Sequence, residues 1–387
     1  MSSLPQANTV NSLGATQSEK DLRLIPGSET VPFESTWQRD LAAAIRHPQQ
    51  LLAALKLSEK DFPRSPADDI VAFPLLVPLS FVGRMEIGNP TDPLLQQVLP
   101  VTAELQTVDG FVADAVGDQH AKRAPGLLQK YQGRALMIAT GSCAVHCRYC
   151  FRRSYPYSQE PRRLADWEPA LRELEADRTI AEVILSGGDP LMLTNSRLSQ
   201  LINRLDAIDH VSRIRIHTRL PIVLPSRIED DLLQLLTSTR KQIIVVVHAN
   251  HANEIRGDCH ESLRRLVTAG LPVLNQAVLL RGINDTAEAL EALSQELINV
   301  GVMPYYLHQL DRVAGAAHFE VDTESGQRFI AKLRSRLPGY AVPRFVQETP
   351  GGSSKTPVES GNTSAALSGM SPGQDQTPSQ TAAREEP

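Results

Sequence analysis

Residues 134–153 read RALMIATGSCAVHCRYCFRR. The first seven of these residues are mostly apolar, which predicts a buried β-strand. Three cysteines follow the predicted strand, Cys143, Cys147 and Cys150, in the spacing C-x3-C-x2-C. A disulfide framework would spread its cysteines along a short secreted chain, whereas this tight group in a long chain indicates a metal site.

Outward from this stretch, apolar runs alternate with amphipathic segments of helical period, which predicts parallel strands joined by helical crossovers. The predicted strands span residues 134–140, 181–187, 213–218, 242–249, 272–280 and 303–310. The predicted helices between and after them span residues 166–177, 196–208, 229–239, 261–270, 286–301 and 324–337.

Polar or reactive residues lie at or near the C-terminal ends of the predicted strands, as at Ser186, His217, His248 and Asp311. A doubly wound sheet would concentrate such residues at one switch point, whereas a barrel places them at the end of every strand. The sequence therefore predicts an α/β fold with a partial barrel of six strand–helix units.

The rest of the chain divides by composition. We expect a flexible leader over residues 1–30, a mostly helical N-terminal lobe over residues 31–125 with helix across residues 35–60, and the barrel over residues 126–358. Residues 359–387 are rich in Ser, Gln, Pro and Gly, which predicts a disordered tail.

The composition excludes two classes of partner. A formal net charge of −5 over 387 residues gives no reason to expect nucleic-acid binding. No apolar run reaches the length of a membrane helix, and the polar N-terminus lacks the apolar core of a secretory signal. These features predict a cytoplasmic protein.

The cysteine motif leaves two kinds of metal site open. Zinc would need a fourth ligand such as His146, because Cys259 lies more than a hundred residues away. An iron–sulfur cluster held by three thiolates keeps one iron open, and that iron could bind S-adenosylmethionine. With Tyr149 before its last cysteine, the motif resembles that of the radical S-adenosylmethionine superfamily, which implies a [4Fe–4S] cluster and a 5′-deoxyadenosyl radical.

The strand that follows the motif ends in SGGDPLM, residues 186–192. Taken alone, this stretch indicates a tight strand-to-helix turn, with Asp189 as a helix cap. Beside the cysteine motif it resembles the superfamily's segment for the amino group of S-adenosylmethionine. The resemblance implies cofactor contacts for Gly187, Gly188 and Asp189.

Three further stretches make the chain similar to the lysine 2,3-aminomutase family: CRYCFRR at residues 147–153, NQAVLLRGIND at residues 275–285 and PGGSSK at residues 350–355. In that family the loop lysine binds pyridoxal phosphate, which implies this role for Lys355. Without the resemblance, Lys355 would be an ordinary surface lysine, and a radical enzyme without pyridoxal phosphate would remain open.

The resemblance implies roles for other residues of the barrel. Arg134 matches the family's phosphate-binding arginine, and Lys130 stands where relatives carry a second arginine. His248 and Gln276 match positions near S-adenosylmethionine. The expected cofactors are therefore a [4Fe–4S] cluster, S-adenosylmethionine and pyridoxal 5′-phosphate.

The same resemblance implies an amino-acid substrate. Arg152 matches the family's arginine for the substrate carboxylate, for which a planar guanidinium is suited. Asp311 and Glu348 match two aspartates that bind the side-chain ammonium of L-lysine, although Glu348 is one methylene longer than the usual residue. Together these three residues predict conversion of L-α-lysine to β-lysine.

Glu348 and His308, which stands where free-lysine relatives carry tyrosine, make the chain similar to the EpmB branch of the family. That branch makes (R)-β-lysine for attachment to translation elongation factor P, which implies an indirect link to that factor and its ligase. An electron donor such as flavodoxin or ferredoxin is also expected, and homo-oligomerisation is left open. The alternatives are a fermentative or osmolyte-forming aminomutase and a metal-binding barrel without catalysis.

Overall fold

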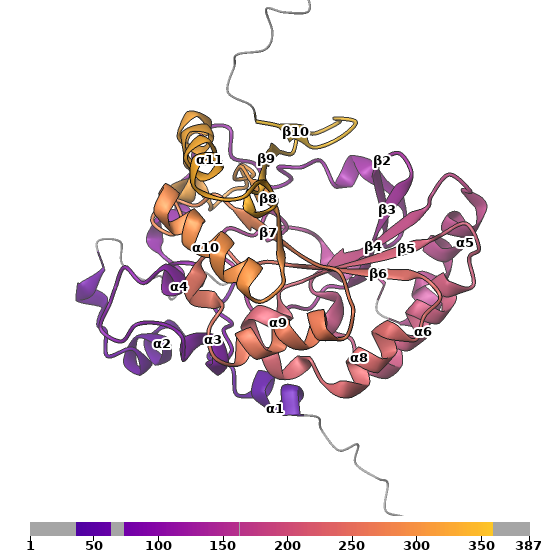
Figure 1. The fold of residues 1–387 in the computed structure, drawn as a ribbon, viewed down its shortest axis with the longest axis horizontal. Helices are drawn as coiled ribbons and strands as arrows, with labels where there is room; N and C mark the ends of the chain where they lie inside the picture. Colours follow the sequence, from indigo (N-terminus) through magenta and orange to yellow (C-terminus); the bar gives the residue numbers. More distant parts are fainter. Residues whose placement is uncertain (1–35, 63–72, 162, 359–387) are drawn as a thin grey trace, which may run out of the picture. The chain divides into compact units, whose positions relative to one another are not determined.

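The computed structural model describes residues 36–62, 73–161 and 163–358. At its centre lies one ten-stranded sheet in which every strand pairs with its neighbours in the sequence (Figure 1). The strands are β1 (Lys122–Ala124), β2 (Leu127–Tyr131), β3 (Arg134–Thr140), β4 (Glu182–Gly187), β5 (Arg213–Thr218), β6 (Gln242–Val247), β7 (Val273–Val278), β8 (Met303–His308), β9 (Arg344–Gln347) and β10 (Thr356–Pro357). The leader and tail expected at residues 1–30 and 359–387 lie outside the described residues.

The strands from β3 to β9 are parallel, and the six predicted from the sequence are the six from β3 to β8. β3 and β5 have the predicted bounds. Their apolar, often β-branched side chains suit a sheet that is covered on its outer face. The predicted α/β fold is confirmed.

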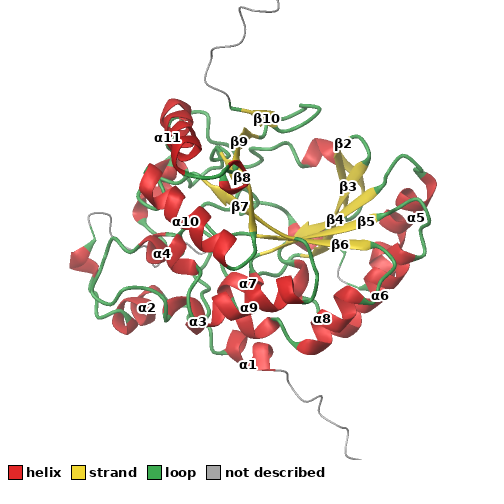
Figure 2. Cartoon of the chain, viewed as in Figure 1, coloured by secondary structure: helices red, strands yellow, loops and turns green. Residues whose placement is uncertain are grey.

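Helices lie along the outer face of the curved sheet (Figure 2). In α6, for example, Leu198, Leu201, Ile202 and Leu205 recur at helical spacing and are all buried. Burying each such side chain stabilises the fold by about 1.5–3 kcal/mol. The crossover and C-terminal helices are α5 (Glu168–Ala176), α6 (Asn195–Asp206), α7 (Leu220–Val223), α8 (Asp230–Thr237), α9 (Asp258–Thr268), α10 (Ala287–Asn299) and α11 (Thr323–Arg336).

The segment before the sheet contains short helices rather than one long one: α1 (Thr36–Ala42), α2 (Pro48–Ala54), α3 (Leu79–Val82) and α4 (Pro93–Gln96). The helix expected over residues 35–60 is interrupted where Ile45 pairs with Val77 in an isolated bridge. Pro48 then starts α2, because proline lacks the N–H group that a helix interior needs. The described residues, which begin at Thr36, form one compact unit. A lobe boundary at residue 125 stays a prediction.

Side chains connect the two edges of the sheet. At the end of β2, the Tyr131 hydroxyl donates a hydrogen bond of 2.6 Å to the Glu348 carboxylate, which follows β9. Lys130 Nζ lies 3.6 Å from the same carboxylate. The interior of the curved sheet is therefore flanked by β2 on one side and by the end of β9 on the other.

No helix among the described residues is long and apolar enough to span a lipid bilayer.

Candidate active site inside the curved sheet

The three motif cysteines lie on the loop that leaves the C-terminal end of β3, as predicted. Inside the loop, the Cys150 N–H donates to the Cys147 carbonyl at 3.0 Å. The Arg148 N–H donates to the Gln97 carbonyl at 2.9 Å, which ties the loop to the end of α4. All three cysteines are free thiols of intermediate exposure.

The electrostatics of the loop suit a cationic group. Burial, followed by the neighbouring thiols, raises the pKa of Cys143 well above its ordinary value, and the same causes raise the pKa of Cys150 to about 11. Thiolates are soft ligands, and an iron–sulfur cluster would relieve their mutual repulsion. Across the described residues, no group of three His, Cys, Asp or Glu side chains could hold a single metal ion, so the cluster assignment rests on donor chemistry.

Gly187 and Gly188 bring β4 into close contact with the cysteine loop. Gly187 has a φ of +115°, and a Cβ atom there would lie 2.6 Å from the Thr140 carbonyl oxygen. A Cβ atom on Gly188 would lie 2.2 Å from the Ser142 carbonyl oxygen. Because no other residue fits at these distances, the two glycines fix the loop against the sheet. Their contact with S-adenosylmethionine stays a prediction.

Asp189 caps the short helix Pro190–Met192 by accepting the Leu191 N–H at 3.0 Å. Its carboxylate also accepts the Thr218 hydroxyl at 2.7 Å and the Arg219 N–H at 2.6 Å. Burial raises the pKa of Asp189 to about 6 despite these bonds. Asp189 is therefore a helix cap in the structure, as the sequence alone indicates. Any contact between Asp189 and S-adenosylmethionine would use a carboxylate that already accepts these hydrogen bonds.

A buried ionic cluster that the sequence analysis missed holds the loop from the other side. Glu104 accepts two hydrogen bonds from Arg148, at 2.9 and 2.6 Å, and one of 2.6 Å from Arg153. Both guanidinium groups also lie over the Phe73 ring, at 4.8 and 4.9 Å. The sequence contains no local signal for this ion pair, because Glu104 and Arg148 are 44 positions apart.

The structure brings together His248, which directly follows β6, and Gln276, which lies within β7; both were predicted near S-adenosylmethionine. The His248 Nε2 and Gln276 Nε2 atoms lie 2.6 Å apart. Burial, with Arg219 as a second cause, lowers the pKa of His248 to about 3. His217, 6.0 Å from His248 between ring centroids, also has a pKa lowered well below its ordinary value by burial. Both imidazoles are therefore neutral hydrogen-bonding groups at pH 7.

Lys355 lies on the hairpin between β9 and β10, beside the Thr356–Gln347 pair. Its Nζ atom donates to Glu348 at 2.5 Å. Burial opposes ionisation of Glu348, but Lys355 and its other donors hold the pKa of this carboxyl below its ordinary value. The sheet therefore brings Glu348 close to both Lys130 and Lys355. The Cζ atom of Arg134 lies over the Tyr131 ring, 4.7 Å from its centroid.

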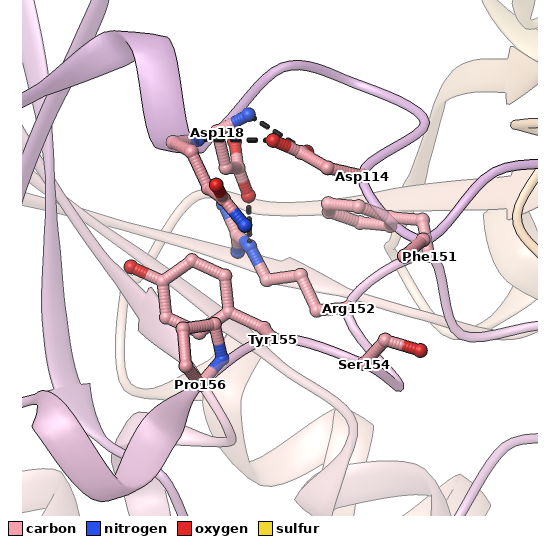
Figure 3. Close-up of a pocket in the computed structure, with 9 residues that line it drawn as sticks. Asp114, Asp118, Phe151, Arg152, Ser154, Tyr155 and Pro156 are labelled. Atoms are coloured by element: carbon pink, nitrogen blue, oxygen red, sulfur yellow. Dashed lines mark hydrogen bonds and ion pairs between the residues drawn. The ribbon is translucent and has the colours of Figure 1, made fainter.

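Arg152 lies in a small pocket with Asp118, Phe151 and Tyr155 (Figure 3). Its Nε atom donates to Asp118 at 2.7 Å, and its Nη1 atom donates to Ser186 at 3.2 Å. Lys130 Nζ lies 2.8 Å from the other oxygen of Asp118. Asp118, which the sequence analysis did not single out, therefore connects the predicted carboxylate-binding arginine to the predicted phosphate-binding lysine.

Asp311 follows β8, and its carboxyl interacts with the charges of Lys355 and Glu348. Burial raises the pKa of Asp311 to about 7, and Lys355 opposes the shift. Burial, followed by Lys355, lowers the pKa of His308 well below its ordinary value. A cationic ligand beside Asp311 would favour its ionised form, which is the behaviour expected of a binding site for an ammonium group.

Comparison with known proteins agrees with the cysteine loop and the sheet around it. Residues 137–293 match the model of the radical SAM superfamily. The L-lysine 2,3-aminomutase of Escherichia coli (strain K12) is 43% identical over 328 residues, covering 85% of this chain and 96% of that protein. The L-lysine 2,3-aminomutase of Haemophilus influenzae is 42% identical over 335 residues, covering 87% of this chain and 99% of that protein.

Among solved structures, a radical SAM methyltransferase from Sphaerobacter thermophilus is 20% identical with a TM-score of 0.43, covering 57% of this chain and 68% of that one. A superposition this loose adds nothing to the sequence comparisons. The two aminomutases are matched over nearly their full lengths, so the similarity includes the segments before and after the cysteine loop.

Proposed function

This chain belongs to the lysine 2,3-aminomutase family of radical S-adenosylmethionine enzymes and is therefore an isomerase. From that premise we propose that it converts L-lysine to (R)-β-lysine. We also propose that pyridoxal phosphate binds at Lys355. Membership of the radical SAM superfamily implies a [4Fe–4S] cluster and S-adenosylmethionine. We propose Cys143, Cys147 and Cys150 as the cluster ligands.

The observation that carries the pyridoxal phosphate assignment is the position of the Lys355 amine. It lies on a hairpin at one edge of the sheet, 2.5 Å from Glu348, and it interacts electrostatically with Asp311. Lys130 approaches the same carboxylate from the opposite edge. An amine flanked by a second cation is suited to an aldehyde cofactor that also carries a phosphate.

When bound, S-adenosylmethionine and the cluster supply a radical that removes hydrogen, and pyridoxal phosphate supplies an aldehyde that holds the migrating amine. The protein's own part is placement. Arg152 would bind the substrate carboxylate through its Nη edge, because Asp118 already occupies Nε. Asp311 would bind the side-chain ammonium, and Glu348 would receive either that ammonium or the displaced Lys355 amine.

The link to elongation factor P rests on departures from free-lysine relatives, namely Glu348 and His308. The longer acid moves a carboxylate by about one bond length, and an imidazole replaces a phenol beside Lys355. Both changes alter the expected lysine pocket, and the (R) product is proposed from the resemblance to the EpmB branch. We further propose a cytoplasmic location, a flavodoxin or ferredoxin as electron donor, and the elongation factor P ligase as the user of the product.

The test is an anaerobic assay of the reconstituted enzyme with S-adenosylmethionine, pyridoxal phosphate and L-lysine, with products separated by chiral chromatography and identified by mass. (R)-β-Lysine is the expected product. The (S) product would favour the fermentative or osmolyte alternative. Cleavage of S-adenosylmethionine without change in lysine would overturn the substrate assignment of Asp311 and Glu348, and no cleavage would leave the non-catalytic metal-binding barrel.

A further inference from the structure

The function proposed above assigns no role to a buried polar network behind the cysteine loop. At its centre is Arg219, which follows β5 and is 6% exposed. Its Nη1 atom contacts the Cys147 sulfur and directs an N–H group at it. Its Nη2 atom donates to Gln97 at 2.6 Å and to Glu254 at 3.0 Å. One guanidinium therefore joins a motif cysteine to two buried side chains from other parts of the chain.

Glu254, which is fully buried in the short helix Ala252–Glu254, holds the guanidinium in this orientation. One of its oxygens accepts the backbone N–H groups of Asn250 and His251, at 2.8 and 3.0 Å, and the side chain of Gln97 at 3.0 Å. The other oxygen accepts Arg219. Because Glu254 is fixed by backbone groups, it keeps Arg219 Nη1 directed at the sulfur.

Aromatic side chains cover the guanidinium. Arg219 Cζ lies 5.5 Å from the centroid of the Phe81 ring and 5.6 Å from that of Tyr149. Asn250 donates to the Tyr149 hydroxyl at 2.7 Å, which holds that ring in place. Solvent therefore screens this charge only weakly, and because Glu254 pairs with Nη2, Nη1 is the donor nearest the Cys147 sulfur.

We propose that Arg219 is a positioning residue that raises the reduction potential of the iron–sulfur cluster through its hydrogen bond to Cys147. Reduction adds one electron to the cluster, and a cationic donor at a ligand sulfur stabilises the added negative charge. Hydrogen bonds to the sulfurs are among the factors that set the potentials of such clusters. The proposal rests on the cluster and on Cys147 as its ligand, and it does not depend on lysine or pyridoxal phosphate.

The test is a redox titration of the reconstituted cluster without S-adenosylmethionine, pyridoxal phosphate or lysine, followed by electron paramagnetic resonance of the reduced state. In Arg219→Gln the midpoint potential should become more negative while iron and sulfide contents stay at the wild-type level. Arg84→Gln is the matched control, because Arg84 also lies over Phe81, at 5.5 Å, and donates to the Glu254 backbone carbonyl. Its midpoint should stay close to that of the wild type.

An unchanged midpoint in fully loaded Arg219→Gln would overturn the proposal, as would an equal shift in Arg84→Gln. If Arg219→Gln does not retain its cluster, Arg219→Lys takes its place. Lysine carries its three donors on one nitrogen and lacks the planar fork that places Nη1 on Cys147 while Nη2 holds Gln97 and Glu254. Pairing of the ammonium with Glu254 should therefore draw the charge away from the sulfur and make the midpoint more negative, and an unchanged value would count against the proposal. Absence of any cluster from the wild-type protein would instead remove the cluster assignment itself.

Discussion

Replacing Asp311 with asparagine should stabilise the ligand-free protein while abolishing lysine turnover. Burial raises the pKa of Asp311 to about 7, whereas an aspartate in an unfolded chain has a pKa near 4. The folded protein therefore binds more protons than the unfolded chain between about pH 4 and pH 7, and its stability falls as the pH rises through that window.

The magnitude follows from the size of the shift. A difference of about three pKa units corresponds to about 4 kcal/mol of stability lost above pH 7, as an upper bound. At pH 5 only about 1.6 kcal/mol of this cost is present. Asparagine does not ionise, so the gain of Asp311→Asn over the wild type should grow by about 2–3 kcal/mol between pH 5 and pH 8.

Urea unfolding of the two cofactor-free proteins at several pH values measures this difference, and the anaerobic lysine assay measures the loss of function. A gain that stays constant from pH 5 to pH 8 would refute the reasoning, because the pH dependence comes only from ionisation of Asp311. Full turnover in the variant would refute its role in binding the ammonium group.

Three further changes test other parts of the site. Lys355→Ala should prevent borohydride from attaching pyridoxal phosphate to the protein while leaving the iron content unchanged; labelling in the variant, read by mass spectrometry, would contradict the assignment. Cys147→Ala should lose the cluster and all cleavage of S-adenosylmethionine, and residual cleavage would count against the radical mechanism. Glu104→Gln should destabilise the apo-protein by about 3–5 kcal/mol, because two buried guanidinium groups lose their carboxylate. Glu288→Gln, at an exposed ion pair with Arg336, is its control and should not change urea unfolding measurably.

The six parallel strands from β3 to β8 were predictable because each is a short apolar run bounded by polar residues. β3 and β5 match to the residue, since burial of alternate side chains leaves a clear pattern. β1, β2, β9 and β10 were not predicted. They have two to five residues, and their pairing depends on neighbouring strands rather than on a periodic sequence of their own.

The parts of the site defined by one short motif were also predictable, notably the cysteine loop after β3. The residues that hold this loop were not. Glu104 meets Arg148 across 44 positions and Gln97 meets Arg219 across 122, so no local pattern connects them. Each of these side chains would be assigned to the surface by its type alone, and only the tertiary structure buries it.

The bond between Tyr131 and Glu348 has a consequence for the order in which the protein is made. These residues are 217 positions apart, and Lys355 follows the second of them on the same hairpin. A chain emerging from the ribosome can therefore complete the cysteine loop and several parallel strands well before the hairpin that carries Lys355 has been synthesised. A contact of such long range is also expected to form late in refolding. A nascent or truncated chain could thus acquire the cluster side of the site while it still lacks the amine that the reaction requires.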